Sequence, residues 1–232
     1  MKKSIEDYLN MQKKQYEGAS GNWTLTDRDW VVGQYDRQNA WKDYDTHLFP
    51  ENVGGVALEY GCGPGRNLIR YRKRFDRIDG VDIAQGNINK AIVNLTSSNI
   101  PLPELMVCDG KSIPVDDETY DVVFSVICLQ HICSYSIRDA IIKDIHRVLK
   151  EGGHFCFQMG FGGKTNGEPW YEYHEDRHDV IGTNGKNDVS VLDESVVVDH
   201  LTDIGFKDIN TCIRDSIKGD NHKNWIWVQC KK

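Results

Sequence analysis

The stretch that decides the predicted fold is Glu59-Tyr60-Gly61-Cys62-Gly63-Pro64-Gly65-Arg66-Asn67. It follows a short apolar run over 53–60 and precedes a helical pattern. Glycines in such a turn let a ligand approach the backbone closely, and the start of the following helix offers N–H groups that have no partner within the helix. A plain tight turn between a strand and a helix has the same composition, so this stretch needs support from other residues.

Asp82 gives that support. It lies at the end of a second apolar run, 77–83, about 20 residues past the glycines, where nucleoside-binding folds place a carboxylate that accepts hydrogen bonds from the ribose. An aspartate at a strand end also serves as a helix cap or turn former. No Gly-Lys-Ser/Thr follows, which excludes a P-loop, and Arg66 stands where the nicotinamide fingerprint has its third glycine. The glycine stretch and Asp82 together indicate a nucleoside ligand without a pyrophosphate.

The surrounding sequence alternates short apolar runs with helical patterns, which predicts an α/β fold with a parallel sheet. The clearest helix precedes the fifth strand, and we expect Gly152-Gly153 to end it. Another amphipathic helix, closed by Gly205, precedes the last two strands. The predicted strands are 53–60, 77–83, 105–108, 120–126, 154–158, 206–214 and 223–230.

Two segments differ from this core. Ile5, Tyr8, Leu9 and Tyr16 are spaced to share one helix face, so residues 1–50 are predicted to form a helical cap. Residues 160–188 are rich in Gly, Asn, His and acids, which is typical of a lid, a binding loop or a disordered segment. No linker separates a second domain. We expect one domain over 1–232, with a cap (1–50), a cofactor-binding core (51–159), an insertion (160–190) and a C-terminal helix with a strand pair (191–232).

Composition restricts the function further. The 28 Lys and Arg residues against 35 Asp and Glu give a formal charge of −7, which argues against a nucleic-acid partner. The 7 cysteines include no CxxC pair, so we expect reduced thiols and neither a disulfide framework nor a metal site. No apolar leader and no membrane span is recognisable, which predicts a soluble, cytoplasmic protein.

The motifs, taken in order, resemble those of the class I S-adenosylmethionine-dependent methyltransferases, and within them the small single-domain group called type 11. The resemblance is dense from 53 to 159, and Gly205-Phe206 extends it toward the C-terminus. The matching motifs are VALEYGCGPG (56–65), GVDI (80–83), CDG (108–110), IPVDDETYDVV (113–123), LQHI (129–132) and IHRVLKEGG (145–153).

This resemblance implies a Rossmann-like, seven-stranded, mostly parallel sheet in the order 3-2-1-4-5-7-6, with one antiparallel strand and helices on both faces. It implies S-adenosylmethionine as the cofactor, with Glu59 and the glycine loop at its methionine end, Asp82 at the ribose and Ile83 at the adenine. It also implies that Asp109 accepts from the adenine amino group, and it gives Cys62 no catalytic role. The implied cofactor-binding residues are Glu59, Gly61, Cys62, Gly63, Gly65, Asn67, Asp82, Ile83, Asp109, Gly110, Ser125 and Val126.

A hydroxyl acceptor needs a general base, whereas a neutral amine does not. His131, which follows the fourth strand, is the candidate base, although a histidine at this motif position is also a common structural residue. His174 and His178 lie in the insertion and spell the HExxH zinc pattern, which requires a helix and a third ligand. We expect no metal there, and metal-assisted methylation of a hydroxyl is the alternative.

The acceptor is predicted to be a small-molecule hydroxyl or amine. A basic run suggests RNA as an alternative, but cations near a helix end are commonly solvated. Aromatic residues of the cap and the insertion are candidates for a pocket wall or for core packing. A protein methyltransferase and a non-catalytic cofactor-binding protein are further alternatives. The basic run is Arg70, Arg72, Lys73, Arg74 and Arg77, and the aromatic residues are Trp23, Trp30, Trp41, Trp170, Tyr171 and Tyr173.

Overall fold

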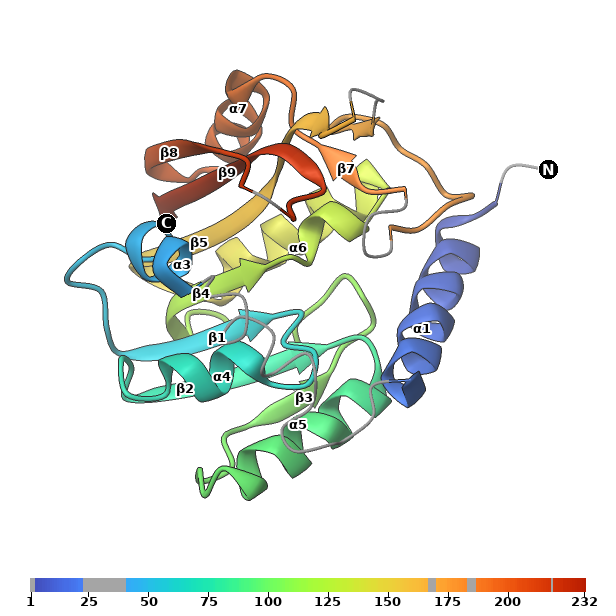
Figure 1. Ribbon diagram of the computed structural model, residues 1–232. Helices are drawn as coiled ribbons and strands as arrows, with labels where there is room; N and C mark the ends of the chain where they lie inside the picture. Colours follow the sequence, from blue (N-terminus) through green and yellow to red (C-terminus); the bar gives the residue numbers. More distant parts are fainter. Residues whose placement is uncertain (1–2, 23–40, 167–169, 183–186, 218) are drawn as a thin grey trace.

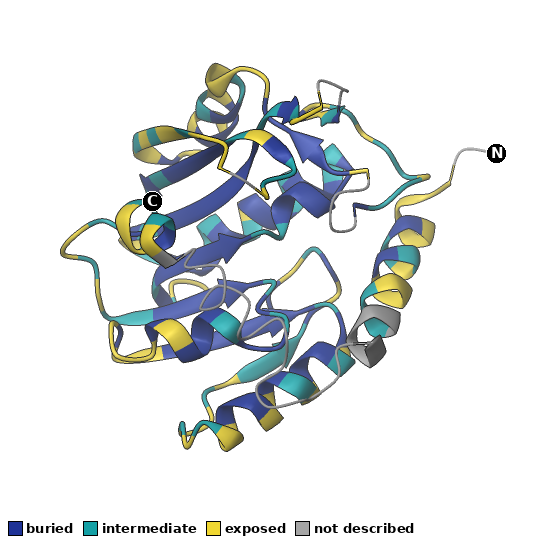
Figure 2. Cartoon of the chain, in the orientation of Figure 1, coloured by how far each residue is buried: buried dark blue, intermediate teal, exposed yellow. Residues whose placement is uncertain are grey.

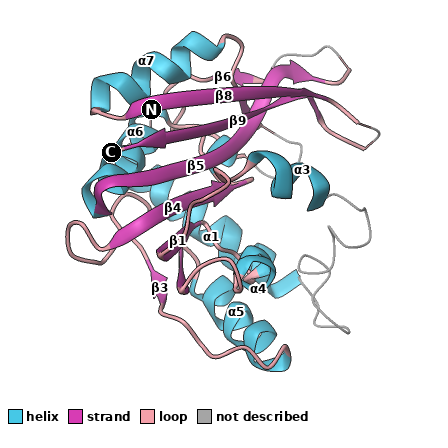
Figure 3. Ribbon diagram, turned by 90° about the vertical axis from the view of Figure 1, so that its left-hand side faces the viewer, coloured by secondary structure: helices cyan, strands magenta, loops and turns pink. Residues whose placement is uncertain are grey.

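The computed structural model describes residues 3–22, 41–166, 170–182, 187–217 and 219–232. Its centre is a seven-stranded sheet in the order β3-β2-β1-β4-β5-β9-β8 (Figures 1 and 3). Neighbours from β3 to β5 pair in parallel, while β9 is antiparallel to β5 and β8. Counted along the chain, this is the order 3-2-1-4-5-7-6 that the resemblance implied. The strands are β1 (Val56–Tyr60), β2 (Arg77–Asp82), β3 (Leu105–Val107), β4 (Tyr120–Val126), β5 (Leu149–Lys164), β8 (Lys207–Asp215) and β9 (His222–Lys231).

Helices cover both faces of the sheet, as expected. Within β4, Val123 packs in the apolar cluster on the α6 and α7 side, while Val122 and Phe124 pack in the opposite cluster with α3, α4 and α5. This alternation follows from the two-residue period of a strand, and Figure 2 shows the resulting buried strands between half-exposed helices. The helices are α1 (Ile5–Asn22), α3 (Trp41–His47), α4 (Arg66–Tyr71), α5 (Gln85–Ser97), α6 (Tyr135–Val148), α7 (Glu194–Ile204) and a 3₁₀ turn, η1 (Leu129–His131).

None of the helices that the structure describes combines the length and the apolar content needed to cross a membrane.

The end of α6 and the bounds of β5 differ from the prediction. The helix ends at Val148, and the chain continues directly as a strand because Leu149 pairs with Tyr120. Gly152-Gly153 therefore lies inside β5, next to a shift in register against β4, and does not end the helix. The strand also continues beyond 158, since its partner β9 extends as far as the Lys164–His222 pair. Gly205, in contrast, closes α7 with a left-handed conformation, as predicted.

The predicted N-terminal helix is present as α1. Ser4 and Asp7 form a reciprocal cap at its start, in which Ser4 N donates to Asp7 Oδ2 (2.9 Å) and Asp7 N donates to Ser4 Oγ (3.1 Å). The helix lies beside α5 at the margin of the molecule (Figure 1). Tyr8 is fully buried, and its hydroxyl accepts a hydrogen bond from Cys133 N (2.7 Å). Helix α1 thus contacts both the α5 side of the fold and the segment that follows β4.

The insertion after β5 contains two short strands, β6 (Tyr171–Glu172) and β7 (Val189–Ser190), which pair in parallel. The sequence predicted an irregular segment here. Backbone hydrogen bonds fasten the insertion to η1 and to the start of α6, because Gly182 N donates to His131 O (2.8 Å) and Arg177 N donates to Cys133 O (3.1 Å). The insertion therefore lies against the segment that follows β4.

Candidate active site

The glycine loop lies at the carboxyl end of β1, where the parallel strands of an open α/β sheet form their binding edge. Gly61, Gly63 and Gly65 have φ angles of 76°, 51° and 86°, which glycine adopts without a steric penalty. Among the described residues, a Cβ on Gly63 would meet no heavy atom within 4 Å, whereas one on Gly61 would overlap Cys128 Sγ. The loop is consequently open beside Gly63.

Glu59 presents a carboxyl group to this loop from within β1. Its Oε1 accepts a hydrogen bond from Asn67 Nδ2 at 2.6 Å, and its Oε2 is buried with no hydrogen-bond partner among the described residues. Burial raises the pKa of Glu59 to about 8, an effect that the Asn67 hydrogen bond and the nearby Arg66 reduce. A buried carboxyl oxygen with no partner has a high desolvation cost unless a ligand contacts it.

Asp82 connects the end of β2 with the glycine loop and with α5. Its Oδ2 accepts from Gly63 N (2.9 Å), and its Oδ1 accepts from Ala84 N (2.9 Å) and Asn87 Nδ2 (3.0 Å). Burial raises the pKa of Asp82 although these three hydrogen bonds lower it. The structure therefore brings the predicted ribose residue into direct contact with the predicted loop.

The predicted adenine-side residues meet next to α1. A Cβ on Gly110 would lie 2.8 Å from both Ile83 Cδ1 and Leu9 Cδ2. Ile83 and Gly110 are therefore neighbours, and Leu9 adds an apolar side chain from α1. The sequence motifs gave no reason to place Leu9 here.

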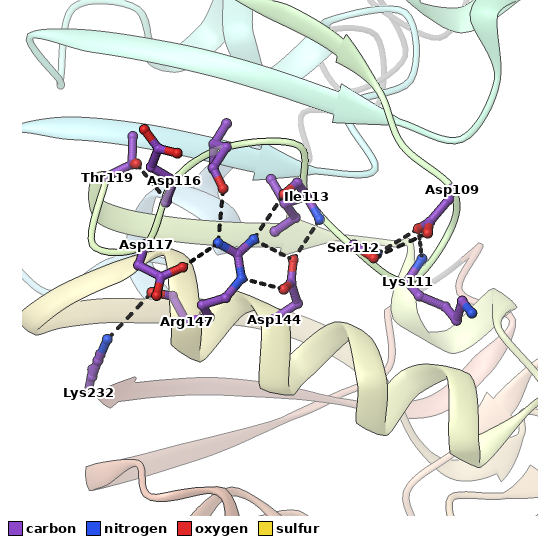
Figure 4. Close-up of polar contacts among 11 residues, drawn as sticks. Asp109, Lys111, Ser112, Ile113, Asp116, Asp117, Thr119, Asp144, Arg147 and Lys232 are labelled. Carbon is purple, nitrogen blue, oxygen red and sulfur yellow. Dashed lines mark hydrogen bonds and ion pairs between the residues drawn. The ribbon is translucent and has the colours of Figure 1, made fainter.

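Asp109 has a local structural role that the sequence did not predict. Its Oδ1 accepts from Lys111 N (2.8 Å) and Ser112 N (2.7 Å), while Ser112 Oγ donates to Oδ2 at 3.2 Å (Figure 4). Partial burial raises the pKa of Asp109, but these hydrogen bonds lower it by more, so the pKa lies below its ordinary value. The exposed carboxylate shapes the turn after β3 and retains accepting capacity at Oδ2.

Arg147 of α6 holds the loop that connects this turn to β4 (Figure 4). Its guanidinium donates to Asp144 Oδ1 and Asp117 Oδ1, each at 2.7 Å, and to the backbone oxygens of Val115 and Ile113. Asp144 Oδ2 also accepts from Ile113 N at 2.6 Å. The loop that includes Asp109 is thereby fixed to the helix packed beneath it.

Ser125 and Val126, at the end of β4, are both buried. The Ser125 hydroxyl donates to Tyr60 O (3.0 Å), and Val126 packs in the core. Ile127, the next residue, has a φ of 49°, a conformation that a β-branched residue rarely adopts and that occurs at functional sites. Burial raises the pKa of the Cys62 and Cys128 thiols, so neither is an activated nucleophile.

His131, in η1, is buried directly after this strand end. Its Nδ1 lies 2.7 Å from Asp188 Oδ1, and Asp188 Oδ2 lies 3.4 Å from His222 Nε2. The sequence singled out His131 but neither of its partners. Asp188 lies in the Gly/Asn-rich insertion and His222 at the start of β9, so only the folded chain brings them together.

The other histidines of the insertion do not form the zinc pattern. Residues 174–178 adopt turns and extended backbone, so the helix that HExxH requires is not formed. His174 packs against Tyr135 and Tyr173, and His178 Nε2 lies 3.2 Å from Asp176 Oδ1. In the part of the chain that the structure describes, no group of three or more His, Cys, Asp or Glu side chains is arranged to hold a metal ion.

The basic run after α4 is engaged within the chain. Arg70 pairs with Asp45, Arg77 pairs with Asp79, and Arg74 donates to Pro50 O. Among the aromatic candidates, Trp170 and Tyr173 are buried and Tyr171 is half-buried. Trp23 and Trp30 lie outside the described residues, and the side chain of Trp41 is not described.

Helix α1 adds residues that the sequence motifs did not identify. The Glu17 carboxylate accepts from Gln85 N (2.7 Å) and Gly86 N (3.0 Å), the first N–H groups of α5. Tyr16 donates to Gly182 O at 3.3 Å. Helix α1 therefore connects the start of α5, directly after Asp82, with the insertion.

A left-handed glycine loop joined to a carboxylate at the next strand end is the arrangement of an α/β protein that binds a nucleoside ligand. Residues 58–157 match the family described as a methyltransferase domain. These residues therefore form a methyltransferase domain, and one of the solved structures that share the fold is a complex with S-adenosyl-L-methionine.

Individual relatives agree with this assignment. The chain is 26% identical over 146 residues to a tRNA (carboxymethyluridine(34)-5-O)-methyltransferase of Saccharomyces cerevisiae. The matched region covers 60% of this chain and 47% of the relative. The chain spans about half the length of several curated relatives that it matches.

Solved structures share the fold at low sequence identity. The DhpI-SAM-HEP complex is similar with a TM-score of 0.66 and 16% identity, over 99% of this chain and 100% of that one. Phosphoethanolamine N-methyltransferase 2 of Haemonchus contortus, in complex with S-adenosyl-L-methionine, gives a TM-score of 0.61 and 18% identity, over 99% of this chain and 60% of that one.

Proposed function

We propose that this protein transfers the methyl group of S-adenosylmethionine to a hydroxyl or amine of a small molecule. The observation that carries the proposal is the buried Oε2 of Glu59, which has no hydrogen-bond partner in the described part of the chain and lies beside a glycine loop where no described residue crowds Gly63. A cationic amino group is the ligand chemistry that offsets the burial of such an oxygen. The amino-acid end of the cofactor carries that group, so the site fits the cofactor.

The remaining cofactor contacts are proposed from the positions described above. Asp82 lies where the ribose hydroxyls are expected, and Ile83 with Gly110 offers an apolar surface for the adenine. The Oδ2 of Asp109 retains capacity for the adenine amino group. The residues expected at the methionine end are Glu59, Gly61, Cys62, Gly63, Gly65, Asn67, Ser125 and Val126.

When bound, the cofactor supplies a methyl group on a positively charged sulfur. The contribution of this chain is to align the acceptor with that methyl and to exclude water. Two segments are suited to enclosing the acceptor: α1, with Tyr8 and Gln12 buried, and the insertion that Gly182 fastens to His131. His131 is proposed as the base where the acceptor is a hydroxyl.

The choice of a small molecule over RNA is supported by charge. The chain carries a formal charge of −7, and Arg70, Arg74 and Arg77 of the basic run have partners within the chain. Neutralising a phosphate backbone requires accessible cations. The tRNA methyltransferase among the relatives is the reason to keep RNA as an outcome of the test.

The test uses S-adenosylmethionine that carries a radiolabelled methyl group. The full chain is incubated with a cell extract, which is then separated into small molecules, RNA and protein. We expect the label in the small-molecule fraction, and we expect Asp82→Asn to abolish the transfer while Asp76→Asn, an exposed residue of the turn before β2, leaves it intact. Label in RNA or protein would replace the proposed acceptor class. Cofactor binding without labelling of any fraction would indicate a non-catalytic binding protein.

A further inference from the structure

The insertion places a buried carboxylate between two histidines. The Asp188 side chain is fully buried; one of its oxygens lies 2.7 Å from His131 Nδ1 and the other lies 3.4 Å from His222 Nε2. Desolvation raises its pKa, but the hydrogen bond with His131 and the proximity of both histidines outweigh this effect and leave the pKa lowered. Asp188 is therefore ionised in the folded protein at neutral pH.

The fold holds His222 in place by packing. Strand β9 is antiparallel to β5, so its first residue comes to the carboxyl edge of the parallel strands, opposite Lys164. The His222 ring lies between Trp170 and Trp225, with ring centroids 5.2 Å and 4.8 Å away. Gly160 leaves room for it, since a Cβ there would overlap the imidazole. Among the described residues, neither ring nitrogen of His222 has a hydrogen-bond partner, and its Nε2 forms an ion-pair contact with Asp188 Oδ2.

The carboxylate determines which nitrogen of His131 carries the proton. An ionised carboxylate only accepts hydrogen bonds, so the Nδ1 of His131 donates and its Nε2 keeps a free lone pair in the neutral ring. No described residue forms a hydrogen bond with this Nε2, and the His131 side chain is 7% exposed. Because η1 follows β4, His131 lies at the edge of the sheet where the acceptor is proposed to bind.

We infer that Asp188, supported by His222, is a positioning residue that holds His131 as a general base, and that the acceptor atom is therefore a hydroxyl oxygen. This inference rests on the proposed methyl transfer. A neutral amine attacks with its own lone pair, whereas a hydroxyl must lose a proton as it attacks. A buried carboxylate that fixes the tautomer of a histidine serves the second case, because it leaves the other ring nitrogen able to accept that proton.

The reaction balances with these groups. The hydroxyl proton of the acceptor passes to His131 Nε2 while its oxygen forms a bond to the methyl carbon. The bond from that carbon to sulfur breaks, and its electron pair stays on the sulfur, which becomes neutral. The positive charge that had been on the sulfur is then on the imidazolium of His131, where Asp188 stabilises it.

The first test identifies the atom methylated. S-adenosylmethionine carrying a ¹³C methyl group is incubated with the protein and the small-molecule fraction of a cell extract, and the product is examined by carbon NMR. We expect the chemical shift of a methoxy carbon. An N-methyl or C-methyl carbon would overturn the inference while leaving methyl transfer itself established, and a protein that binds no cofactor would instead overturn the proposed function.

The second test measures directly which ring nitrogen of His131 is protonated. Long-range ¹H–¹⁵N spectra of histidine-labelled protein should show His131 protonated at Nδ1 and unprotonated at Nε2 at neutral pH. Asp188→Asn offers an amide N–H to the ring, and the tautomer should reverse. We expect transfer to fall at least about 100-fold in this variant, with the affinity for S-adenosylhomocysteine changed less than about threefold.

The matched control is Asp179→Asn, an exposed aspartate of the same insertion that pairs with Arg177 at 2.8 Å; it should alter neither the tautomer nor the rate. A wild-type His131 protonated at Nε2, or an Asp188→Asn variant with full activity, would overturn the inference. If Asp188→Asn does not fold, the signals missing from the spectrum of His131→Gln identify those of His131 in the wild-type protein. The chemical shift of the methyl carbon in the wild-type product still shows whether oxygen or nitrogen is methylated.

Discussion

Glu59 Oε1 lies 2.6 Å from Asn67 Nδ2, and the second oxygen of this carboxyl group, Oε2, is buried without a partner among the described residues. Burial raises the pKa of Glu59 to about 8, so the group is mostly protonated near neutral pH. A cationic ligand favours the ionised form of a neighbouring carboxyl group. Cofactor binding should therefore release a proton from Glu59.

This proton release predicts that affinity depends on pH. Affinity for S-adenosylhomocysteine should rise between about pH 6 and about pH 8, by at most tenfold per pH unit from this group. Glu59→Gln should bind more weakly and keep only the pH dependence of the ligand's own α-amino group, whose pKa is about 8. Calorimetric titration in two buffers with different ionisation enthalpies measures the protons released. Equal proton release in both proteins would contradict the assignment of Glu59.

The same carboxyl group affects the stability of the cofactor-free protein. Its pKa in the folded state, about 8, lies above the ordinary glutamate value of 4.5, so the folded state binds more protons and the free energy of unfolding falls as pH rises between these values. Glu59→Gln cannot ionise at this position, so its free energy of unfolding should not show this fall with rising pH. Relative to the difference between the two proteins at about pH 5, the variant should gain about 4 kcal/mol of stability over the wild type at about pH 8.5. Urea unfolding at both pH values measures this, and a constant difference would show that Glu59 titrates normally.

Glu17 is predicted to hold α1 in place. Its carboxylate accepts from Gln85 N (2.7 Å) and Gly86 N (3.0 Å) at the positive end of α5. Glu17→Ala leaves both donors without this acceptor, which should weaken the attachment of α1 by about 1 kcal/mol. Hydrogen exchange over residues 5–17 should become faster, and cofactor affinity should fall because Leu9 is less firmly placed beside Ile83. Glu6→Ala, at an exposed position of the same helix, is the control, and unchanged exchange in Glu17→Ala would refute the role of Glu17.

Gly160 is predicted to be required for the position of His222. A methyl group at this position would overlap the imidazole, so Gly160→Ala should destabilise the fold by about 1–3 kcal/mol and reduce methyl transfer. Gly54→Ala is the control, since a Cβ on this exposed residue would meet no atom of the described residues within 4 Å. Thermal unfolding of both variants measures the difference. Equal stability would mean that His222 can move without cost.

The glycine loop was predictable because the signals that specify it are local, whereas the sheet order was implied by the resemblance to a known family. Left-handed glycines at a strand end, and Asp82 at the next, are set by neighbouring residues. The position of His131 followed from the strand before it. The end of α6 was not predictable from Gly152-Gly153, because the pairing of Leu149 with Tyr120 begins β5 earlier.

The partners of the site depend on contacts between distant parts of the chain. Asp188 and His222 meet His131 only through the insertion and the antiparallel pairing of β5 with β9. Asp109 resembled a ligand contact in the motif, yet its hydrogen bonds to Lys111 and Ser112 show a turn-forming role that the motif does not reveal.

The central claim is that the edge formed by Glu59, the glycine loop and Asp82 binds S-adenosylmethionine. Calorimetric titration of the purified protein with S-adenosylhomocysteine tests it most directly. We predict one site per chain with a dissociation constant on the order of 10 μM or tighter. We also predict that Asp82→Asn, whose amide nitrogen cannot accept from Gly63 N, weakens binding at least tenfold while Asp76→Asn does not. No detectable binding, or equal binding by both variants, would contradict the claim.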